Sequence, residues 1–528
     1  MNMNKFLIGC AMVGLMAGCQ TKPTDTWHKQ YGTLTDGTTT PTTLQYGTFN
    51  DATTARRIAV LLPLTGDAGA MGRAIRTSIE TATLQRGPEN LSVTFYDTAQ
   101  NTTTAINDAL TTNPEVIIGP LFAADARTLR AMKPDEMPAI SFTSDANAIG
   151  NGVMTMALMP SDGVEAIIDE IASDKSRGIL ILAPDTNSGR QMAAAARAAA
   201  TARDITTSGL IYYREGNTDS IKDAAHRGSI YAARNAANNR AREILSDILT
   251  NDRLTAIERS SISRQLDNIS KNDTLGRLPY DAVLFLGGAD DAKSLAAFLR
   301  YYGLTAHDAR FYGTAMWDGA DISDFNLVGA KYSALPEQSA GFARIYEMVS
   351  GTTPARISSF GYDATNLAMG MLYTEKTPAA YLMNPGGYVG VDGLFRIMPT
   401  GASQRGLRVM EVTNDTPRTL RDAPTNFATP IYRTTTADTL NSPREMAVET
   451  PGINPLTYIQ IPDRLQSKYK AKTYGANINK TTTPTTQNIV TIMGDDDGET
   501  IAATADFTSA RPESVTRQNI DSVEIYER

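Results

Sequence analysis

The chain of 528 residues has room for three to four domains of about 150 residues each, and its apolar fraction of 41% is enough to form a sizeable core. Its 49 Lys and Arg against 57 Asp and Glu give a net charge of -8, which argues against a nucleic-acid partner, because such proteins normally carry a basic surplus. With two cysteines near the start and three scattered histidines, the chain lacks the residues for a zinc site, a disulfide framework or a cysteine protease.

The first nineteen residues have the pattern of a lipoprotein signal segment. Lys5 precedes an apolar stretch, residues 6–16, which is too short to cross a bilayer and is typical of a secretory signal. The run LMAGC at residues 15–19 resembles a bacterial lipobox, in which the cysteine becomes lipidated and forms the new N-terminus. The alternative is an ordinary signal peptide that contains a cysteine. We predict lipidation at Cys19, and Gln20 implies, by resemblance to enteric lipoproteins, an outer-membrane location facing the periplasm.

Both ends of the chain have the composition of unstructured segments. Residues 20–55 are rich in Thr, Gly, Asp and Pro without apolar periodicity, which is typical of a linker. Residues 416–528 are similarly Thr-rich, with an acidic run at 495–497 and few aromatics, so we predict a low-complexity, largely disordered tail. The short apolar patch at 489–493 leaves a late strand or a docking motif open as alternatives.

Between residues 56 and 415 the pattern predicts alternating strands and helices. Residues 58–62 (IAVLL) form a continuous apolar run, as expected of a strand covered on both faces. The first series of predicted elements comprises strand 58–62, helix 71–82, strand 91–96, helix 105–110, strand 116–118 and strand 139–142. The second series comprises strand 178–183, helix 188–202, strand 209–213, strand 281–286, helix 291–302 and strand 310–313. These two series predict two doubly wound, Rossmann-like α/β lobes. In such lobes ligands bind at the carboxyl ends of the strands.

Residues 220–280 interrupt the second series. Their apolar residues recur at near-helical spacing with arginines between them, and the segment is too long for one crossover, so we predict an inserted helical pair. A solvated, charged helix face and a partner-binding surface explain this pattern equally well.

The order of strands and turns resembles the type I periplasmic binding proteins, in their leucine/isoleucine/valine-binding branch. The resemblance is carried by RIAVLLPLTGDAGAMG at 57–72, VIIGPL at 116–121, AISFTSDAN at 139–147 and SSFGYDATNLAMGM at 358–371. Within that branch, the LLPL and GPL motifs look most like the lipoprotein activators of penicillin-binding proteins. The resemblance implies a first lobe at 56–158 and 336–385, and a second at 159–335 and 386–415.

The resemblance also implies a ligand cleft between the lobes. In the family, hydroxyl and backbone N–H groups at two strand ends of the first lobe bind a carboxylate, while an acidic residue and tyrosines of the second lobe bind an ammonium. The candidate cleft residues at the corresponding positions are Thr65, Gly66, Phe122, Ala123, Ser141, Thr143, Ser144, Ser188, Asp290 and Trp317.

Several of these positions depart from the family pattern. Phe122 and Ala123 stand where a hydroxyl is usual, and Ser188 stands near the usual tyrosine. The stretch 314–316 replaces the one that brings the ammonium-binding glutamate, and Asp290 is not at the matching position. An ammonium in a desolvated cleft without a counter-charge costs several kcal/mol. We therefore expect the pocket for a free amino acid to be lost.

The remaining motifs indicate structure rather than chemistry. Gly66, Gly69 and Gly72 have neither the dinucleotide nor the P-loop spacing, and indicate a turn with close helix packing. We place His307 on the surface and expect Trp317 in the core or a cleft wall, and the tyrosine pair at 301–302 against the sheet. Because there is no paired-carboxylate, triad or metal constellation, we predict a non-enzyme without cofactor or metal.

The favoured hypothesis is a lipid-anchored, non-catalytic activator or scaffold of a penicillin-binding protein in peptidoglycan synthesis. Its expected partners are that peptidoglycan synthase, the lipid membrane through N-terminal acylation, and a small polar ligand if the cleft has kept one, but no nucleic acid. The alternative is a substrate-binding lipoprotein of an ABC importer for an amino acid, amide or related small solute.

Overall fold

The computed structural model describes residues 41–43, 55–87, 90–374, 376–427, 443–450, 452–474, 490–493 and 500–503. The predicted signal segment and Cys19 lie outside these residues, as does most of the linker. Contacts divide the chain into two units, one of Met1–Arg242 with Asp267–Pro455 and one of Glu243–Leu266 with Leu456–Arg528. Within the described ranges, no helix has both the length and the apolar character needed to span a membrane.

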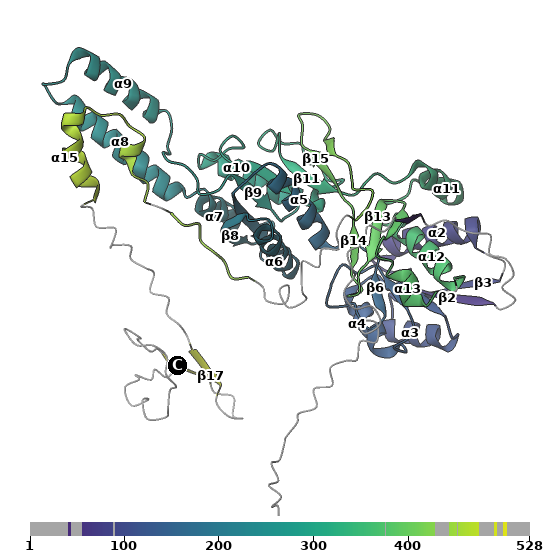
Figure 1. Ribbon diagram of the computed structural model, residues 1–528. Coiled ribbons are helices and arrows are strands. Elements are labelled where there is room, and N and C mark those ends of the chain that lie inside the picture. Colours follow the sequence, from purple (N-terminus) through teal and green to yellow (C-terminus); the bar gives the residue numbers. More distant parts are fainter. Residues whose placement is uncertain are drawn as a thin grey trace, which may run out of the picture. The chain divides into compact units, whose positions relative to one another are not determined.

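The first lobe of the larger unit is built on a sheet of five parallel strands in the order β3-β2-β4-β5-β6 (Figure 1). Its strands are β2 (Arg56–Leu62), β3 (Leu91–Asp97), β4 (Val116–Ile118), β5 (Ala139–Ser141) and β6 (Val153–Thr155). The first four strands were predicted from their apolar runs, while the three-residue β6 was not.

Helices cover both faces of this sheet, as the continuous apolar run in β2 predicts. Ile58, Val60 and Leu62 pack against α2 (Gly69–Arg86) and α12 (Ser358–Leu372) in one cluster. The intervening Ala59 and Leu61 belong to a second cluster, formed with the helices on the other face. Those helices are α3 (Thr102–Thr111) and α4 (Ala123–Met132), and the first lobe also holds α11 (Ala340–Ser350) and α13 (Pro378–Leu382).

A second, four-stranded sheet also belongs to the first lobe, in the order β1-β12-β13-β14. Its strands are β1 (Thr42–Thr43), β12 (Tyr388–Gly390), β13 (Gly393–Ile397) and β14 (Ser403–Arg405). Tyr388, Phe395 and Ile397 pack in the same core as Ile58 and Val60. Our assignment of 386–415 to the second lobe was therefore wrong for residues 388–405, because these apolar side chains are buried in the first. The chain returns to the second lobe only after β14.

The second lobe contains a seven-stranded sheet in the order β16-β15-β11-β10-β9-β7-β8. Its parallel strands are β7 (Gly178–Pro184), β8 (Thr206–Tyr213), β9 (Ala282–Phe285), β10 (Arg310–Gly313) and β11 (Lys331–Ala334), followed by the antiparallel β15 (Arg408–Glu411) and β16 (Arg418–Arg421). The α/β class with two doubly wound lobes is thus confirmed, although β11, β15 and β16 were not predicted as strands.

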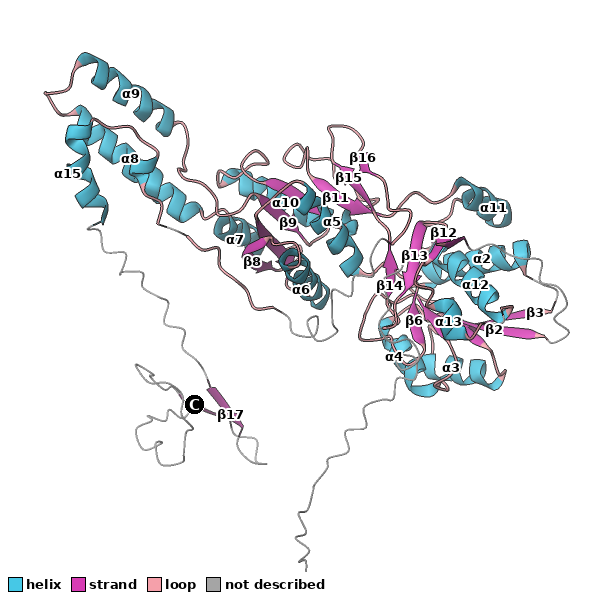
Figure 2. Ribbon diagram, viewed as in Figure 1, coloured by secondary structure: helices cyan, strands magenta, loops and turns pink. Residues whose placement is uncertain are grey.

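The helices of the second lobe again lie on both faces of its sheet (Figure 2). One face packs α5 (Pro160–Ser173) and α6 (Asn187–Thr201), and the other packs α7 (Thr218–Gly228) and α10 (Ala289–Tyr301). The alanine-rich α6 lies close to the strand that precedes it, since a Cβ on Gly189 would be 2.1 Å from the Pro184 carbonyl oxygen. Gly72 is placed alike in the first lobe, where a Cβ would lie 1.9 Å from the Pro63 carbonyl oxygen, which confirms the close helix packing predicted there.

The predicted helical insertion starts later than we expected. Its first helix, α7, packs against β8 and α10 in the core of the second lobe and is therefore an ordinary crossover helix. The inserted pair consists of α8 (Tyr231–Leu249) and α9 (Ala256–Ser270).

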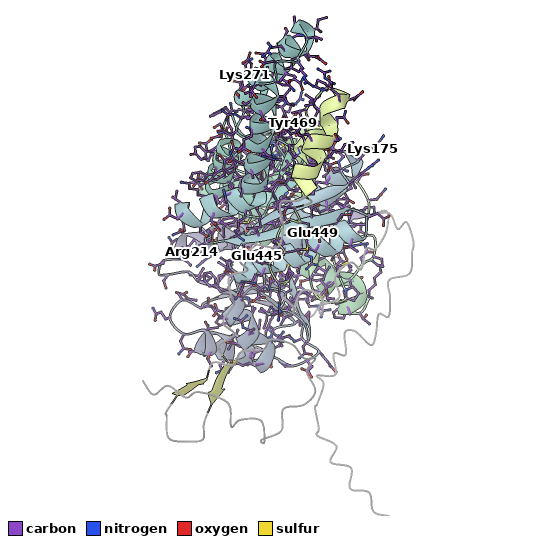
Figure 3. The ribbon with its side chains drawn as sticks, turned by 90° about the vertical axis from the view of Figure 1, so that its left-hand side faces the viewer. Lys175, Arg214, Lys271, Glu445, Glu449 and Tyr469 are labelled. Carbon is purple, nitrogen blue, oxygen red and sulfur yellow. The ribbon has the colours of Figure 1, made fainter. Side chains whose placement is uncertain are left out.

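Part of the predicted C-terminal tail is structured. It contributes β16, and Met446 forms an antiparallel bridge with Leu210 at the β8 edge of the same sheet. Beside that bridge, Glu445, labelled in Figure 3, accepts hydrogen bonds from Arg227 and from the Tyr212 N–H. The patch at 489–493 largely coincides with β17 (Val490–Met493), which pairs with β18 (Thr500–Ala503). The tail prediction was too broad, because its composition did not show these pairings.

The smaller unit joins the tip of the helical insertion to a helix of the tail, α15 (Asp463–Tyr474). Arg464 makes a bidentate ion pair with Glu258 of α9, at 2.6 and 2.8 Å, and this pair lowers the pKa of Glu258 to about 2. Tyr469, on α15 in Figure 3, donates a 2.6 Å hydrogen bond to Asp247 of α8. The insertion is therefore covered in part by the chain's own tail.

Candidate functional site

The two lobes arrange their parallel strands in the same chain order, with the second strand at one edge followed by the first, third, fourth and fifth. In such sheets ligands bind beyond the carboxyl ends of the first and third strands, where the chain turns to opposite faces. That point lies between β2 and β4 in the first lobe and between β7 and β9 in the second. The candidate residues lie at the carboxyl ends of strands in both lobes. In the first lobe they are Thr65 and Gly66 after β2, Phe122 and Ala123 after β4, and Ser141, Thr143 and Ser144 at the end of β5. In the second lobe they are Ser188 after β7, Asp290 after β9 and Trp317 after β10.

The loop after β2 is held by Asp97, the last residue of β3. Its carboxylate accepts hydrogen bonds from the Leu64 N–H at 2.8 Å and from the Thr65 hydroxyl at 2.6 Å. Burial acts to raise the pKa of Asp97, but these hydrogen bonds and one from the Ala99 N–H lower it below its ordinary value. Gly66 has a φ of 67°, which a side chain would disfavour. The Thr65 hydroxyl thus donates to the protein itself, and the loop is fixed without a ligand.

The hydroxyl groups at the end of β5 are also used within the protein. Ser141 is buried and donates to the Pro120 carbonyl at 2.8 Å, and the buried Thr143 accepts from the Asp145 N–H at 3.1 Å. Only Ser144 of these three is exposed. Phe122 and Ala123 offer no side-chain donor.

In the second lobe, Trp317 fills the space beyond the strand ends. It lies in a 3-10 turn, η1 (Ala315–Trp317), and is completely buried. Its Nε1 donates to the carbonyl of Gly287, which follows β9, at 3.1 Å, and its ring packs against Phe285 and Tyr332. A Cβ on Gly313 would meet the ring at 2.4 Å, so glycine at the end of β10 makes room for it. Trp317 is therefore a core residue.

The two remaining candidates in the second lobe are exposed. The Asp290 side chain is 97% exposed and pairs with Lys293 at 3.1 Å. Ser188 lies exposed in the first turn of α6. Neither offers the desolvated carboxylate that would balance a buried ammonium. Two surface pockets, of about 490 and 460 Å³, are lined by other residues of the second lobe.

A buried charge cluster, formed by Arg405, Asp162, Asp363 and Asp392, was not predicted from the sequence. Arg405 is 4% exposed, and its Nη2 donates to the Met156 carbonyl at 2.7 Å. Its Nε and Nη1 find no acceptor among the described residues, and the guanidinium lies 4.4 Å from the ring centroid of Phe360.

Each of the three carboxyl groups of this cluster accepts a hydrogen bond. The donor to Asp162 is the main-chain N–H of Arg405 at 3.2 Å, and the donor to Asp363 is the main-chain N–H of Val391 at 3.0 Å. The donor to Asp392 is the Ser359 hydroxyl. Burial raises the pKa of Asp162 to about 8 and that of Asp363 to about 7, although the positive charge of Arg405 acts to lower both. Burial also raises the pKa of Asp392.

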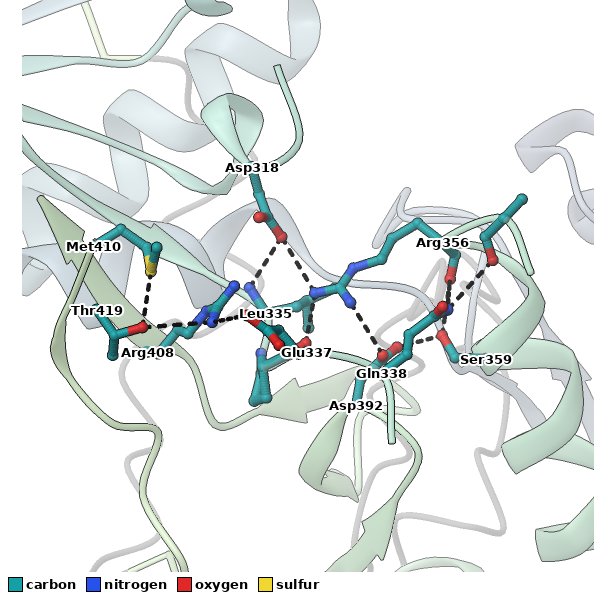
Figure 4. A network of polar contacts seen from close by, with 12 residues as sticks. Asp318, Leu335, Glu337, Gln338, Arg356, Ser359, Asp392, Arg408, Met410 and Thr419 are labelled. Atoms are coloured by element: carbon teal, nitrogen blue, oxygen red, sulfur yellow. Dashed lines mark hydrogen bonds and ion pairs between the residues drawn. The ribbon is translucent and has the colours of Figure 1, made fainter. Parts of the chain in front are cut away.

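This buried cluster continues into a network that links the lobes (Figure 4). Arg356, just before α12, donates to the Pro336 carbonyl at 2.6 Å, to Asp318 of the second lobe at 3.3 Å and to Asp392 at 3.5 Å. Asp318 also accepts from the Leu335 N–H at 3.3 Å. The Asp318 carboxylate thus contacts Leu335, directly after β11 of the second lobe, and Arg356 of the first lobe.

The chain crosses between the lobes three times, and charged groups lie at each crossing. Met156 and Asp162 flank the passage from β6 to α5, Pro336 lies between β11 and α11, and Arg405 ends β14 before β15. Arg405 ties the third crossing to the first through Met156 and Asp162, and Arg408, three residues further on, donates to Glu337 of the second crossing at 3.2 Å. The only sequence signal was Asp363, the one charged residue of helix α12. The other members come together through the fold and share no spacing.

The strand order and the two lobes are those of the type I periplasmic binding protein fold. A solved protein described as a "putative branched-chain amino acid ABC transporter", from Rhodospirillum rubrum, superimposes with a TM-score of 0.52 at 16% sequence identity, covering 69% of this chain and 100% of that one. At this identity the likeness concerns the fold.

Sequence comparison points to a particular group within that class. Residues 17–208 match a family model described as "LppC putative lipoprotein". The chain is 27% identical over 175 residues to the penicillin-binding protein activator LpoA of Histophilus somni, covering 32% of this chain and 29% of that protein. It is 24% identical over 248 residues to the protein of the same name from Pasteurella multocida, covering 46% and 42%. The chain thus matches less than half the length of these relatives. The resemblance drawn from the sequence motifs, to type I binding proteins and to these activators, is confirmed.

Proposed function

We propose that this chain is a lipid-anchored, non-catalytic activator or scaffold of a penicillin-binding protein in peptidoglycan synthesis. The observation that carries the proposal is the sequence match: residues 17–208 fit the lipoprotein family model, and relatives from three organisms bear the name of penicillin-binding protein activator.

The strand-end geometry supports an interaction protein over a solute receptor. Trp317 occupies the end of the second lobe's sheet, and Thr65 and Ser141 donate their hydroxyl protons to the protein itself. A receptor for a free amino acid needs an unpaired carboxylate at this place to balance the ammonium. The exposed Asp290, paired with Lys293, does not supply it.

The placement at the outer membrane rests on the start of the chain. The family match begins at residue 17, so it includes Cys19 in the LMAGC run. Acylation at Cys19 with more than one chain would anchor the protein stably, which a single acyl chain does not. The Thr-rich residues 20–55 would then separate the folded lobes from the bilayer.

The proposed mechanism involves no bond chemistry by this chain. It binds an active conformation of the synthase more tightly than an inactive one and so shifts the population toward activity. Within the described ranges, no group of three His, Cys, Asp or Glu side chains is placed to hold a metal ion.

Reciprocal affinity purification tests the proposal. The tagged mature chain should retain one penicillin-binding protein of the same cell, and that tagged synthase should retain this chain. Absence of enrichment in both directions would count against an activator. A thermal-shift screen of amino acids and amides covers the importer alternative, because a ligand at 100 times its Kd should stabilise the lobes by about 2.7 kcal/mol.

A further inference from the structure

A pocket of about 490 Å³ lies in the second lobe at the amino ends of β10 and β11, the edge opposite to the strand ends described above. It is formed by the end of α10, the loop from α10 to β10 and the loop that precedes β11. The lining residues that bear on its chemistry are Arg300, Leu304, His307, Arg310, Phe311 and Phe325.

The lining is cationic although the whole chain carries a net charge of -8. Arg300 and Arg310 bring two guanidinium groups, and no Asp or Glu is among the described residues that line the pocket. Two aspartates lie in the same loops and are tied to lining residues: Asp308 accepts from the N–H and hydroxyl of Thr305 at 2.8 and 2.9 Å, and Asp324 accepts from the N–H of Asn326 at 2.7 Å. The Arg310 guanidinium already donates to the Asp174 carbonyl at 2.9 Å. Arg300 is therefore the group of this lining that attracts an anion.

Arg300 is positioned to bind that anion. Its guanidinium lies 5.1 Å from the ring centroid of Phe325, and in the described part of the chain it pairs with no carboxylate. A guanidinium stacked on an aromatic face keeps its N–H groups available at the edge, where they fit a carboxylate in bidentate fashion.

Two large side chains of these elements are exposed. Phe325, which lies against Arg300, is 69% exposed. Tyr301, the residue after Arg300, is 73% exposed, contrary to our expectation that both tyrosines of the pair pack on the sheet. Tyr302 alone is buried, and it packs edge-on against the Tyr301 ring. Tyr and Arg are the residue types in which the binding energy of protein interfaces concentrates.

We propose that the surface formed by Arg300, Phe325 and the pocket that they line binds a segment of a protein partner that carries a carboxylate next to an aromatic or aliphatic side chain. The carboxylate pairs with Arg300, and the apolar side chain enters the pocket. The proposal rests on the proposed function, because the partner is the activated synthase. A peptide segment fits better than a small solute, since solute sites enclose most of their ligand whereas Phe325 faces outward.

The test measures the affinity of the purified synthase for the immobilised mature chain. The variants Arg300→Glu and Phe325→Ala should lower the affinity at least tenfold and threefold respectively, and the effect of Arg300→Glu should shrink at high salt. Arg344→Glu and Met348→Ala are matched controls at exposed positions of α11 in the first lobe, and both should bind like the wild type. Circular dichroism and thermal unfolding of each variant show that the lobes remain folded.

The outcomes separate the two proposals. If the wild type fails to bind any penicillin-binding protein, the proposed function fails. If the wild type binds and both pocket variants bind equally well, the docking surface is elsewhere and this inference is overturned. Titration calorimetry with phenylacetate, a free aromatic carboxylate, tests whether the pocket binds a small solute instead. Micromolar binding that Arg300→Glu abolishes, with unchanged synthase affinity, would make the pocket a solute site and also overturn the inference.

Discussion

The guanidinium of Arg356 in the first lobe lies 3.3 Å from the carboxylate of Asp318 in the second. This contact connects the segment before α12 with the loop after β10, and both residues also contact the crossing at 335–336. Because the Arg356 side chain is 38% exposed, solvent weakens the ion pair, and its contribution is to local order more than to global stability.

Asp318→Ala should therefore loosen one crossing without unfolding the protein. The Leu335 N–H, which donates to the Asp318 carboxylate, should lose its acceptor and exchange its hydrogen faster, while the free energy of unfolding falls by only about 1 kcal/mol. Hydrogen exchange with mass spectrometry of the 335–338 peptide measures this. Asp321→Ala, at a carboxylate 3.9 Å from Lys293, is the control and should leave that peptide unchanged. Equal exchange in Asp318→Ala and the wild type would contradict the assigned contact.

Arg405→Met should destabilise the larger unit strongly. Arg405 is the positive charge buried among Asp162, Asp363 and Asp392, and methionine of similar length would leave these carboxyl groups without it. Removing one partner of a buried charge pair costs about 3–5 kcal/mol. Urea unfolding at pH 9, where Asp162 and Asp363 are ionised, measures the loss, and Arg405→Lys, which keeps the charge, should recover part of it. A loss below about 1 kcal/mol for the methionine variant would show that the cluster is not held by this charge.

The buried cluster also predicts a pH dependence of stability. The pKa of Asp162 is about 8 in the folded chain, against an ordinary value of 3.8. Between these values the folded state keeps a proton that the unfolded state has released, so the free energy of unfolding should fall as the pH rises from 5 to 7.5. The slope from one such group is at most about 1.4 kcal/mol per pH unit. Carboxyl groups whose pKa is lowered, such as Asp174, act mainly below this window.

Asp162→Asn isolates this contribution, because the amide cannot titrate and still accepts from the Arg405 N–H. Urea midpoints at pH 5 and 7.5 should differ less in the variant than in the wild type. Asp363, whose pKa is about 7, leaves a residual slope in both proteins. Identical slopes would mean that Asp162 is ionised in the folded state.

The close helix packing predicts a sharp contrast between glycines. Gly189→Ala would place a Cβ 2.1 Å from the Pro184 carbonyl oxygen, and relieving that overlap should cost about 1–3 kcal/mol or more. Gly341→Ala, in α11 with no atom within 4 Å of the new Cβ, should be neutral or stabilising by about 0.5–1 kcal/mol. Thermal unfolding of the two variants compares them directly. Equal midpoints would contradict the packing of α6 on β7.

Much of the fold was predictable because its strands are covered on both faces. The continuous apolar runs of β4, β7 and β9 were placed within a residue of their observed ends. The short strands β6 (Val-Met-Thr) and β12 (Tyr-Val-Gly) were missed, because each includes a Thr or Gly and neither is the unbroken apolar run that marks the equally short β4. The pairing of β1 with β12 joins segments more than three hundred residues apart, and no local pattern could show it.

The candidate site was predictable in place but less so in detail. Strand order puts the loops after β2, β4, β7 and β9 at one edge of each sheet, which the alternating pattern already implied. Whether Trp317 faces that edge or the core depends on the bare backbone of Gly313, a contact that spacing does not reveal. The charge cluster around Arg405 gathers residues from α5, α12, β14 and the turn between β12 and β13, and apart from Asp363 each carboxylate looks in sequence like an ordinary surface residue.

The measurement that tests the central claim most directly is the rate of glycan polymerisation by the purified synthase, with and without an excess of the mature chain. Activation by population shift predicts a rate that rises with the concentration of this chain and reaches a plateau, and Arg300→Glu should need at least ten times more protein to reach half of that plateau. A rate that stays constant across all concentrations, for a synthase that demonstrably binds the chain, would contradict activation.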